Sequence, residues 1–99
     1  MAYSLPLPGR LKSQGWKVKI LDKELPWEPP HVTVINGTRR WRIRLSDGKF
    51  MDKIPAPSDV PDDLLEFIQD EEQWNTVIDN WNSTYPNNPH PASEDDDGS

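Results

Sequence analysis

The chain has no cysteine among its 99 residues. Disulfide bonds, zinc sites with thiolate ligands and cysteine nucleophiles are therefore excluded. A long apolar run is missing too, since Pro6 and Pro8 interrupt the apolar patches near the N-terminus. Neither a secretory signal nor a membrane span is expected, so we predict a cytoplasmic protein. The sequence also has no Gly-rich phosphate loop with a Walker lysine and no Ser-His-Asp motif, which leaves two common kinds of enzyme without support.

Lysine and arginine are missing from the chain after Lys53. All eleven lie between Arg10 and Lys53, together with five acids, whereas the part from Asp59 onward holds twelve acids. The two parts therefore carry about +6 and −12, for a net charge of −6. Such segregation indicates a surface that binds a polyanion, an acidic masking segment, or a protein partner of matching polarity. The simpler alternative is a basic sheet beside acidic helices, with most charges solvated.

The stretch His31–Leu45 predicts a β-hairpin around which the domain is organised. Two runs of alternating character flank Asn36-Gly37, a strong short-range signal for a tight turn. If these two residues form the loop, both at positive φ, Ile35 lies opposite Thr38. The same register brings His31 close to Arg42.

Alternation along the two strands separates an apolar face from a basic face. The apolar face carries Val32, Val34, Trp41, Ile43 and Leu45. The opposite face carries His31, Thr33, Arg40, Arg42 and Arg44. The hairpin is therefore expected to supply both a wall of the core and a basic outer surface.

Two further strands are expected beside the hairpin. Residues 16–21 alternate, with Lys17 and Lys19 on the outer side, where they would extend the arginine face. After the hairpin, Asp47-Gly48 offers a second two-residue loop that would place Phe50 opposite Leu45. This last strand is expected to be short or bulged, because its alternation would place Asp52 on the core face.

Two helices are predicted after the sheet. Ser58 or Asp59 can cap the first, and an acidic break at residues 70–72 separates it from the second. The second helix carries an apolar stripe at steps of three and four residues, which is typical of a core-facing side. The stripe consists of Trp74, Val77, Ile78, Trp81 and Tyr85. The predicted fold class is α+β: a small antiparallel sheet of three to four strands, covered on one face by two C-terminal helices.

Three regions are expected along the chain. Residues 1–14 form an irregular N-terminal arm, which Leu5 and Leu7 can attach to the body. Residues 15–86 form a single α+β domain. Residues 87–99 form a disordered acidic tail, because they lack apolar side chains able to offset the entropy of ordering.

The basic face is the candidate functional surface. We predict that it binds an acidic protein partner or nucleic acid through its charged residues. These are Lys17, Lys19, His31, Arg40, Arg42 and Arg44. The periodicity turns most aromatic side chains inward, so Trp27 in the loop before the hairpin is the one aromatic candidate for stacking on bases.

His31 is the one candidate catalytic residue. A neutral imidazole among arginines could act as a general base in phosphoryl transfer, with the cations stabilising the developing charge. A histidine at the start of a strand is more often a structural hydrogen-bonding residue. The second histidine, His90, lies in the expected tail, and one histidine with carboxylates makes a poor metal site. No metal or other cofactor is therefore predicted.

The run Pro29-Pro30-His31-Val32-Thr33-Val34 resembles the signature of a family of small bacterial proteins of unknown function. That signature reads Pro-Pro-His, a hydrophobic residue, His and another apolar residue. The resemblance implies a strand before the motif, a hairpin after it and two closing helices, the second ending in an Asn-Trp pair, which matches Asn80-Trp81. The second histidine of the signature is Thr33 here, so a paired-histidine device would lack one of its members. The suspected place of the family in two-gene modules of the toxin–antitoxin kind implies a small partner protein encoded nearby.

Together these observations predict a small cytosolic interaction domain without enzymatic activity. One component of a two-gene module that binds an acidic protein or nucleic acid would fit this description. The alternative is a small RNA-directed toxin in which His31 and the arginines perform phosphoryl chemistry.

Overall fold

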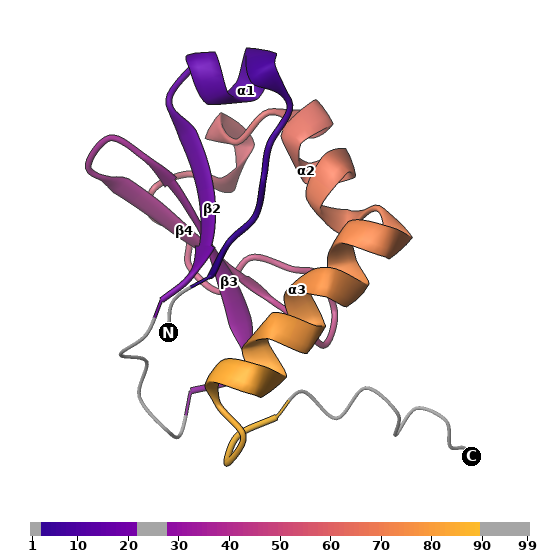
Figure 1. Cartoon of the computed structure of the whole chain (residues 1–99). Helices are drawn as coiled ribbons and strands as arrows, with labels where there is room; N and C mark the ends of the chain where they lie inside the picture. The colour runs from indigo at the N-terminus through magenta and orange to yellow at the C-terminus, as the bar shows by residue number, and fades with distance from the viewer. Residues whose placement is uncertain (1–2, 22–27, 90–99) are drawn as a thin grey trace.

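The computed structural model describes residues 3–21 and 28–89. Its elements follow one another along the chain as a first strand, a short helix, three strands and three closing helices (Figure 1). They are β1 (Tyr3–Ser4), α1 (Gly9–Ser13), β2 (Trp16–Ile20), β3 (His31–Asn36), β4 (Arg39–Arg44), the 3-10 helix η1 (Pro57–Asp59), α2 (Asp62–Gln69) and α3 (Glu71–Thr84). The predicted α+β class is confirmed.

The sheet is a four-stranded antiparallel meander in the order β1-β2-β3-β4. Its fourth strand comes from the N-terminal arm, where Tyr3 pairs with Ile20, and not from residues after the hairpin. The arm predicted to be irregular thus contains β1 and α1. As expected, Leu5 attaches the arm to the body, and Leu11 on α1 is also buried. The prolines of this segment favoured the prediction of an irregular arm. The two short elements β1 and α1 form nevertheless, through contacts with the rest of the domain.

The β3–β4 hairpin forms, with its loop one residue later than predicted. Asn36 belongs to β3 and pairs with Arg39, so Gly37 and Thr38 make the loop. Gly37 alone has a positive φ, of 63°, which suits a turn with glycine at its first central position. Because each partner shifts by two residues, Val34 now lies opposite Trp41 and the two faces keep their predicted members.

The strand predicted after Asp47-Gly48 is reduced to one bridge, between Ile43 and Phe50. The predicted pairing of Phe50 with Leu45 is therefore wrong by two residues. Ile54, which would continue such a strand, is 87% exposed. Asp52 binds an arginine on the outer side of the sheet, which draws this segment away from a regular ladder.

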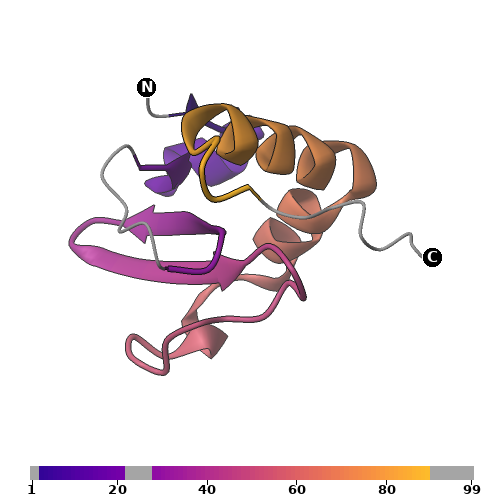
Figure 2. The same cartoon turned by 90° about the horizontal axis from the view of Figure 1, so that it is seen from below.

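The two C-terminal helices cover one face of the sheet, as predicted; Figure 2 shows α2 and α3 together on one side of the β3–β4 hairpin. They meet at Asp70, which ends α2 and caps α3 by accepting a hydrogen bond from the Glu72 N–H at 3.2 Å. Of the predicted stripe, Trp74 and Tyr85 are half-buried against the core and the other members are buried. Fully buried side chains from both layers include Val18, Val34, Trp41 and Ile43 of the sheet and Leu64, Ile68, Val77 and Trp81 of the helices.

The segment after α3 returns to the start of β3. Tyr85 donates its hydroxyl hydrogen to the Leu21 carbonyl. Asn88 donates through Nδ2 to the Glu28 carbonyl at 2.8 Å, and its own carbonyl accepts from the Trp81 indole at 2.7 Å. Residues 87–89, expected at the start of the tail, thus include an ordered contact, while residues 90–99 lie outside the described part of the chain. None of the helices in the described part is both long and apolar enough to cross a membrane.

Candidate functional site: the outer face of the sheet

The sheet registers arrange the outer side chains in cross-strand rows. In the first row, nearest the hairpin loop, Lys17 lies opposite Ile35, and Ile35 lies opposite Arg40. The second row contains Lys19, Thr33 and Arg42 in the same order of strands. The third row pairs His31 with Arg44. Neighbouring strands lie about 4.8 Å apart, so each row brings side chains from separate strands within reach of one ligand.

The second row is closed by acidic residues of the same chain. Arg42 binds Asp52 through two hydrogen bonds of 2.9 and 2.7 Å, and its second terminal nitrogen lies 3.2 Å from the Glu28 carboxylate. We call these three residues the Arg42 clasp. Its side chains are only 21–33% exposed, and Thr33 beneath is buried. The clasp joins β4 to the loops on either side of the hairpin, so Arg42 has a structural role.

The Arg42 guanidinium lowers the pKa of Asp52 below its ordinary value, chiefly through the hydrogen bonds it donates to this carboxylate. Partial burial opposes this effect, and the charges of Arg42 and His31 add to it. The carboxylate is thus held in its ionised form. An ionised Asp52 keeps the clasp intact at neutral pH, so the Arg42 guanidinium stays engaged with two carboxylates.

The third row is buried or paired as well. His31 is 1% exposed, and its ring lies 5.3 Å from the ring of Trp81. Its Nδ1 forms a 2.8 Å hydrogen bond with the Pro29 carbonyl. Arg44 forms an ion pair of 3.3 Å with Asp47 in the following turn. The prediction of an accessible histidine on the outer surface is therefore wrong, because the end of α3 and the loop before β3 enclose it.

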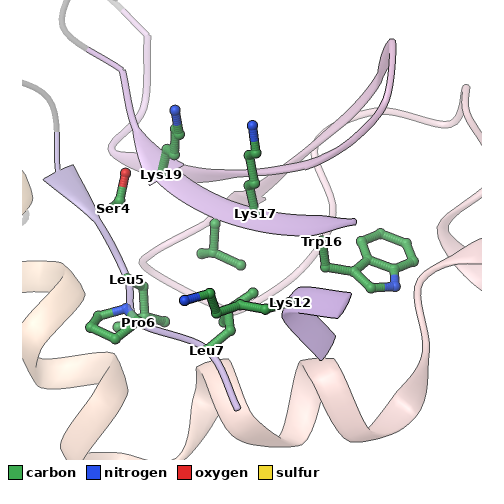
Figure 3. A pocket seen from close by; sticks show the side chains of 9 residues that line it. Ser4, Leu5, Pro6, Leu7, Lys12, Trp16, Lys17 and Lys19 are labelled. Carbon is green, nitrogen blue, oxygen red and sulfur yellow. The ribbon is translucent and has the colours of Figure 1, made fainter. Parts of the chain in front are cut away.

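The first row, together with Lys19, remains the open part of this face. Lys17 and Arg40 are exposed, while Ile35 between them and Lys19 in the next row are half-buried. Within residues 3–21 and 28–89, no ion pair involves Lys17, Lys19 or Arg40. Lys17 and Lys19 project side by side from β2 (Figure 3). We call Lys17, Lys19, Ile35 and Arg40 the basic row.

Of the six predicted site residues, the structure thus groups Lys17, Lys19 and Arg40 and separates them from His31, Arg42 and Arg44. Sequence reasoning missed Glu28 and Asp52, which bind Arg42. Both residues lie in irregular loops, one before β3 and one after β4. No spacing in the sequence indicates that these loops bring the two carboxylates to Arg42.

Two other expectations concern chemistry elsewhere. Trp27, the candidate for stacking, lies outside the described residues, as do residues 90–99 of the expected acidic tail. In the described part of the chain, no group of three or more histidine, aspartate or glutamate side chains is arranged to hold a metal ion.

No protein-family model matches this chain, and neither a curated protein nor a solved structure is significantly similar to it. The resemblance carried by residues 29–34 therefore stays a prediction, and the site must be interpreted from its own geometry.

Proposed function

We propose that this protein is a non-catalytic interaction domain that binds an acidic segment of a partner protein on the basic row. The main support is the alignment of Lys17, Ile35 and Arg40 across three neighbouring strands, with no acidic partner among the described residues. Cations that flank a half-buried isoleucine suit a partner carrying carboxylates around an apolar side chain, since such a partner meets both charge and apolar complementarity.

Two features favour a protein over nucleic acid. The basic row offers three cations, a short track compared with the extended grooves that follow a phosphate backbone. Its central side chain is aliphatic, and base stacking needs an aromatic side chain on the surface. The partner is therefore expected to present a compact acidic patch. A small protein encoded nearby, as the family resemblance implies, would satisfy this requirement.

The alternative of an RNA-directed toxin receives less support. General-base catalysis needs an imidazole within hydrogen-bonding reach of the substrate, and His31 is enclosed between α3 and the loop before β3. Its cross-strand neighbour, Arg44, is paired with Asp47.

The test is fluorescence anisotropy of labelled poly-L-glutamate, single-stranded RNA and duplex DNA against the full chain, at low and moderate salt. We expect salt-dependent binding of poly-L-glutamate that the double variant Lys17→Ala/Arg40→Ala weakens by about threefold to tenfold. The matched control is Arg39→Ala, on the same strand as Arg40, because Arg39 is paired with Asp59 and lies over the Trp41 ring.

Each outcome decides between the candidate functions. Poly-L-glutamate binding that depends on the basic row supports the proposal. Stronger binding of RNA or DNA, lost in the same double variant, would replace it with a nucleic-acid function. Absence of binding to all three probes at low salt would refute a polyanion-binding function. A shortened chain that ends at Pro89 tests whether the acidic residues after His90 mask the basic row, because it removes them and retains the contacts of Asn88.

A further inference from the structure

A cleft opens where the N-terminal arm leaves the sheet. The Leu5 N–H donates to the Val18 carbonyl at 2.8 Å, and beyond this bond the arm turns away from β2 toward α1 (Figure 3). The space between the arm, α1 and β2 has a volume of about 330 Å³. This lies at the lower end of the range of about 300–1,000 Å³ that is common for small-molecule sites.

The lining of the cleft combines apolar side chains with charges of one sign. Its apolar side chains include Leu5, Leu7, Trp16 and Val18. Its charged side chains are Lys12, Lys17 and Lys19, and none of its lining residues is acidic. Low-dielectric walls with one sign of charge concentrate the potential in a cleft, so an anion is attracted to it.

The three lysines come from two elements. Lys12 extends from α1 back along the cleft toward the arm, whereas Lys17 and Lys19 project from β2 (Figure 3). In the described part of the chain, none of the three forms an ion pair. Figure 3 shows the ammonium groups of Lys17 and Lys19 on the side of β2 away from Lys12. A ligand in the cleft can therefore meet the Lys12 ammonium group without displacing an internal carboxylate, and the other two lysines add positive charge at the rim.

We propose that this cleft binds a small amphipathic carboxylate, with its apolar body against the leucines and Trp16 and its carboxylate beside Lys12. Leu7 is half-buried, while Leu5, Trp16 and Val18 are only 1–7% exposed. The apolar body of a ligand would therefore cover Leu7 and the small exposed edges of the other three side chains. The lysines require an anionic head. The volume excludes a long-chain lipid held along its whole length, so the ligand has a compact aliphatic or aromatic body.

This site is distinct from the function proposed above, although Lys17 and Lys19 line both surfaces. Lys12 belongs to the cleft alone, and Arg40 belongs to the basic row alone. Variants at these two positions therefore separate the two proposals.

The experiment is a titration of the full, ¹⁵N-labelled chain with sodium octanoate, followed by amide and indole chemical shifts. Sodium acetate supplies the carboxylate without the apolar body, and 1-octanol supplies the body without the charge. We expect octanoate to cause saturable shifts confined to residues 4–7, 12 and 16–19, including the indole N–H of Trp16. Acetate and 1-octanol are expected to bind at least about threefold more weakly.

Charge reversal of Lys12 provides the matched set of variants. Because Lys12 is exposed on a surface helix, Lys12→Glu is expected to fold and to weaken octanoate binding by about threefold to tenfold, and Lys12→Arg to restore it. Lys49→Glu, at an exposed position outside the cleft, is the control for net charge. Arg40→Ala is expected to leave octanoate binding unchanged.

The proposal fails if octanoate shifts do not saturate or spread over the whole surface. Equal affinities for octanoate and 1-octanol would refute a role for the lysines. Unchanged octanoate affinity in Lys12→Glu would have the same consequence. Loss of poly-L-glutamate binding in Arg40→Ala with octanoate binding retained would support both proposals separately.

Discussion

Replacing Arg42 by alanine is the most informative perturbation of the outer face, because it removes the centre of the Arg42 clasp. A hydrogen bond to a charged group contributes about 1.5–3 kcal/mol to stability, and Arg42 donates two such bonds to Asp52. Since the Arg42 and Asp52 side chains keep exposures of 33% and 29%, water screens part of this interaction. We expect Arg42→Ala to lower the free energy of unfolding by about 1–2 kcal/mol at neutral pH.

The loss should depend on pH in a defined direction. Arg42 lowers the pKa of Asp52 below its ordinary value of 3.8 in the folded state, so the pair stabilises the fold above that value. This contribution disappears as the pH falls through the folded-state pKa, where Asp52 becomes protonated. The difference between the wild-type chain and Arg42→Ala is therefore expected to shrink as the pH falls through the folded-state pKa of Asp52, which lies below 3.8.

Urea denaturation followed by tryptophan fluorescence measures both quantities. The control is Arg10→Ala, because Arg10 and Asp63 are also 2.7 Å apart but their side chains are 59% and 45% exposed. An exposed pair contributes about 0–1 kcal/mol. Equal losses for the two variants at neutral pH would contradict the importance of burial. A loss in Arg42→Ala that persists unchanged in acid would contradict the assignment to carboxylates.

Three further substitutions test the fold. His31→Ala is expected to destabilise the domain by about 2–3 kcal/mol, because it removes a buried ring and a hydrogen bond; a stability near that of the wild-type chain in urea denaturation would refute this structural role. Gly37→Ala should cost about 1–2 kcal/mol through its positive φ alone, since nothing lies within 4 Å of an added Cβ. Gly9→Ala is the control, equally open but without positive φ, and equal losses in thermal unfolding would contradict the explanation. Asn88→Ala should cost about 0.5–1.5 kcal/mol through its lost bond to the Glu28 carbonyl, and faster amide exchange around residue 88 would accompany that loss.

Much of the fold was predictable because the hairpin strands and α3 have clear periodic patterns of apolar side chains. Strand alternation in residues 31–45 identified the two faces, and helical spacing identified α3 together with its break from α2. The registers of the strand pairs were harder to predict than the strands themselves. The position of the tight turn was wrong by one residue. Asn36 belongs to β3, and its side chain donates to the Gln14 carbonyl at 3.3 Å; local sequence patterns do not indicate such a contact between distant segments.

The N-terminal arm shows a different limit of sequence reasoning. β1 has two residues and α1 has five, which is too short for periodicity to register. Leu5 and Leu11 nevertheless enter the core, so these elements form through tertiary contacts. The cleft beside Lys12 depends on this arrangement, and for that reason no local pattern in the sequence indicated it.

The sequence predicted which side chains lie on the outer face of the sheet. The structure then showed which of them are exposed and which are buried or paired. Alternation correctly assigns Arg40 and Arg42 to one side of the hairpin, because side chains of alternate residues share a face. It cannot tell that two loops bring Glu28 and Asp52 over Arg42, nor that α3 encloses His31. Irregular segments follow no period, so their acids could not be matched to particular arginines beforehand.

Because only some arginines of the outer face are exposed and unpaired within the described residues, their charges should be tested one at a time. Neutralising Arg40, Arg42 and Arg44 together would remove one open cation and two paired ones, and any loss of binding would be mixed with loss of stability. Arg40→Ala alone should weaken polyanion binding at unchanged free energy of unfolding, because no ion pair of Arg40 exists in the described part of the chain. Arg42→Ala should lower the free energy of unfolding first. If Arg42→Ala instead abolished binding at full stability, the open surface would have to extend across the second row, and the clasp would have to open when the partner binds.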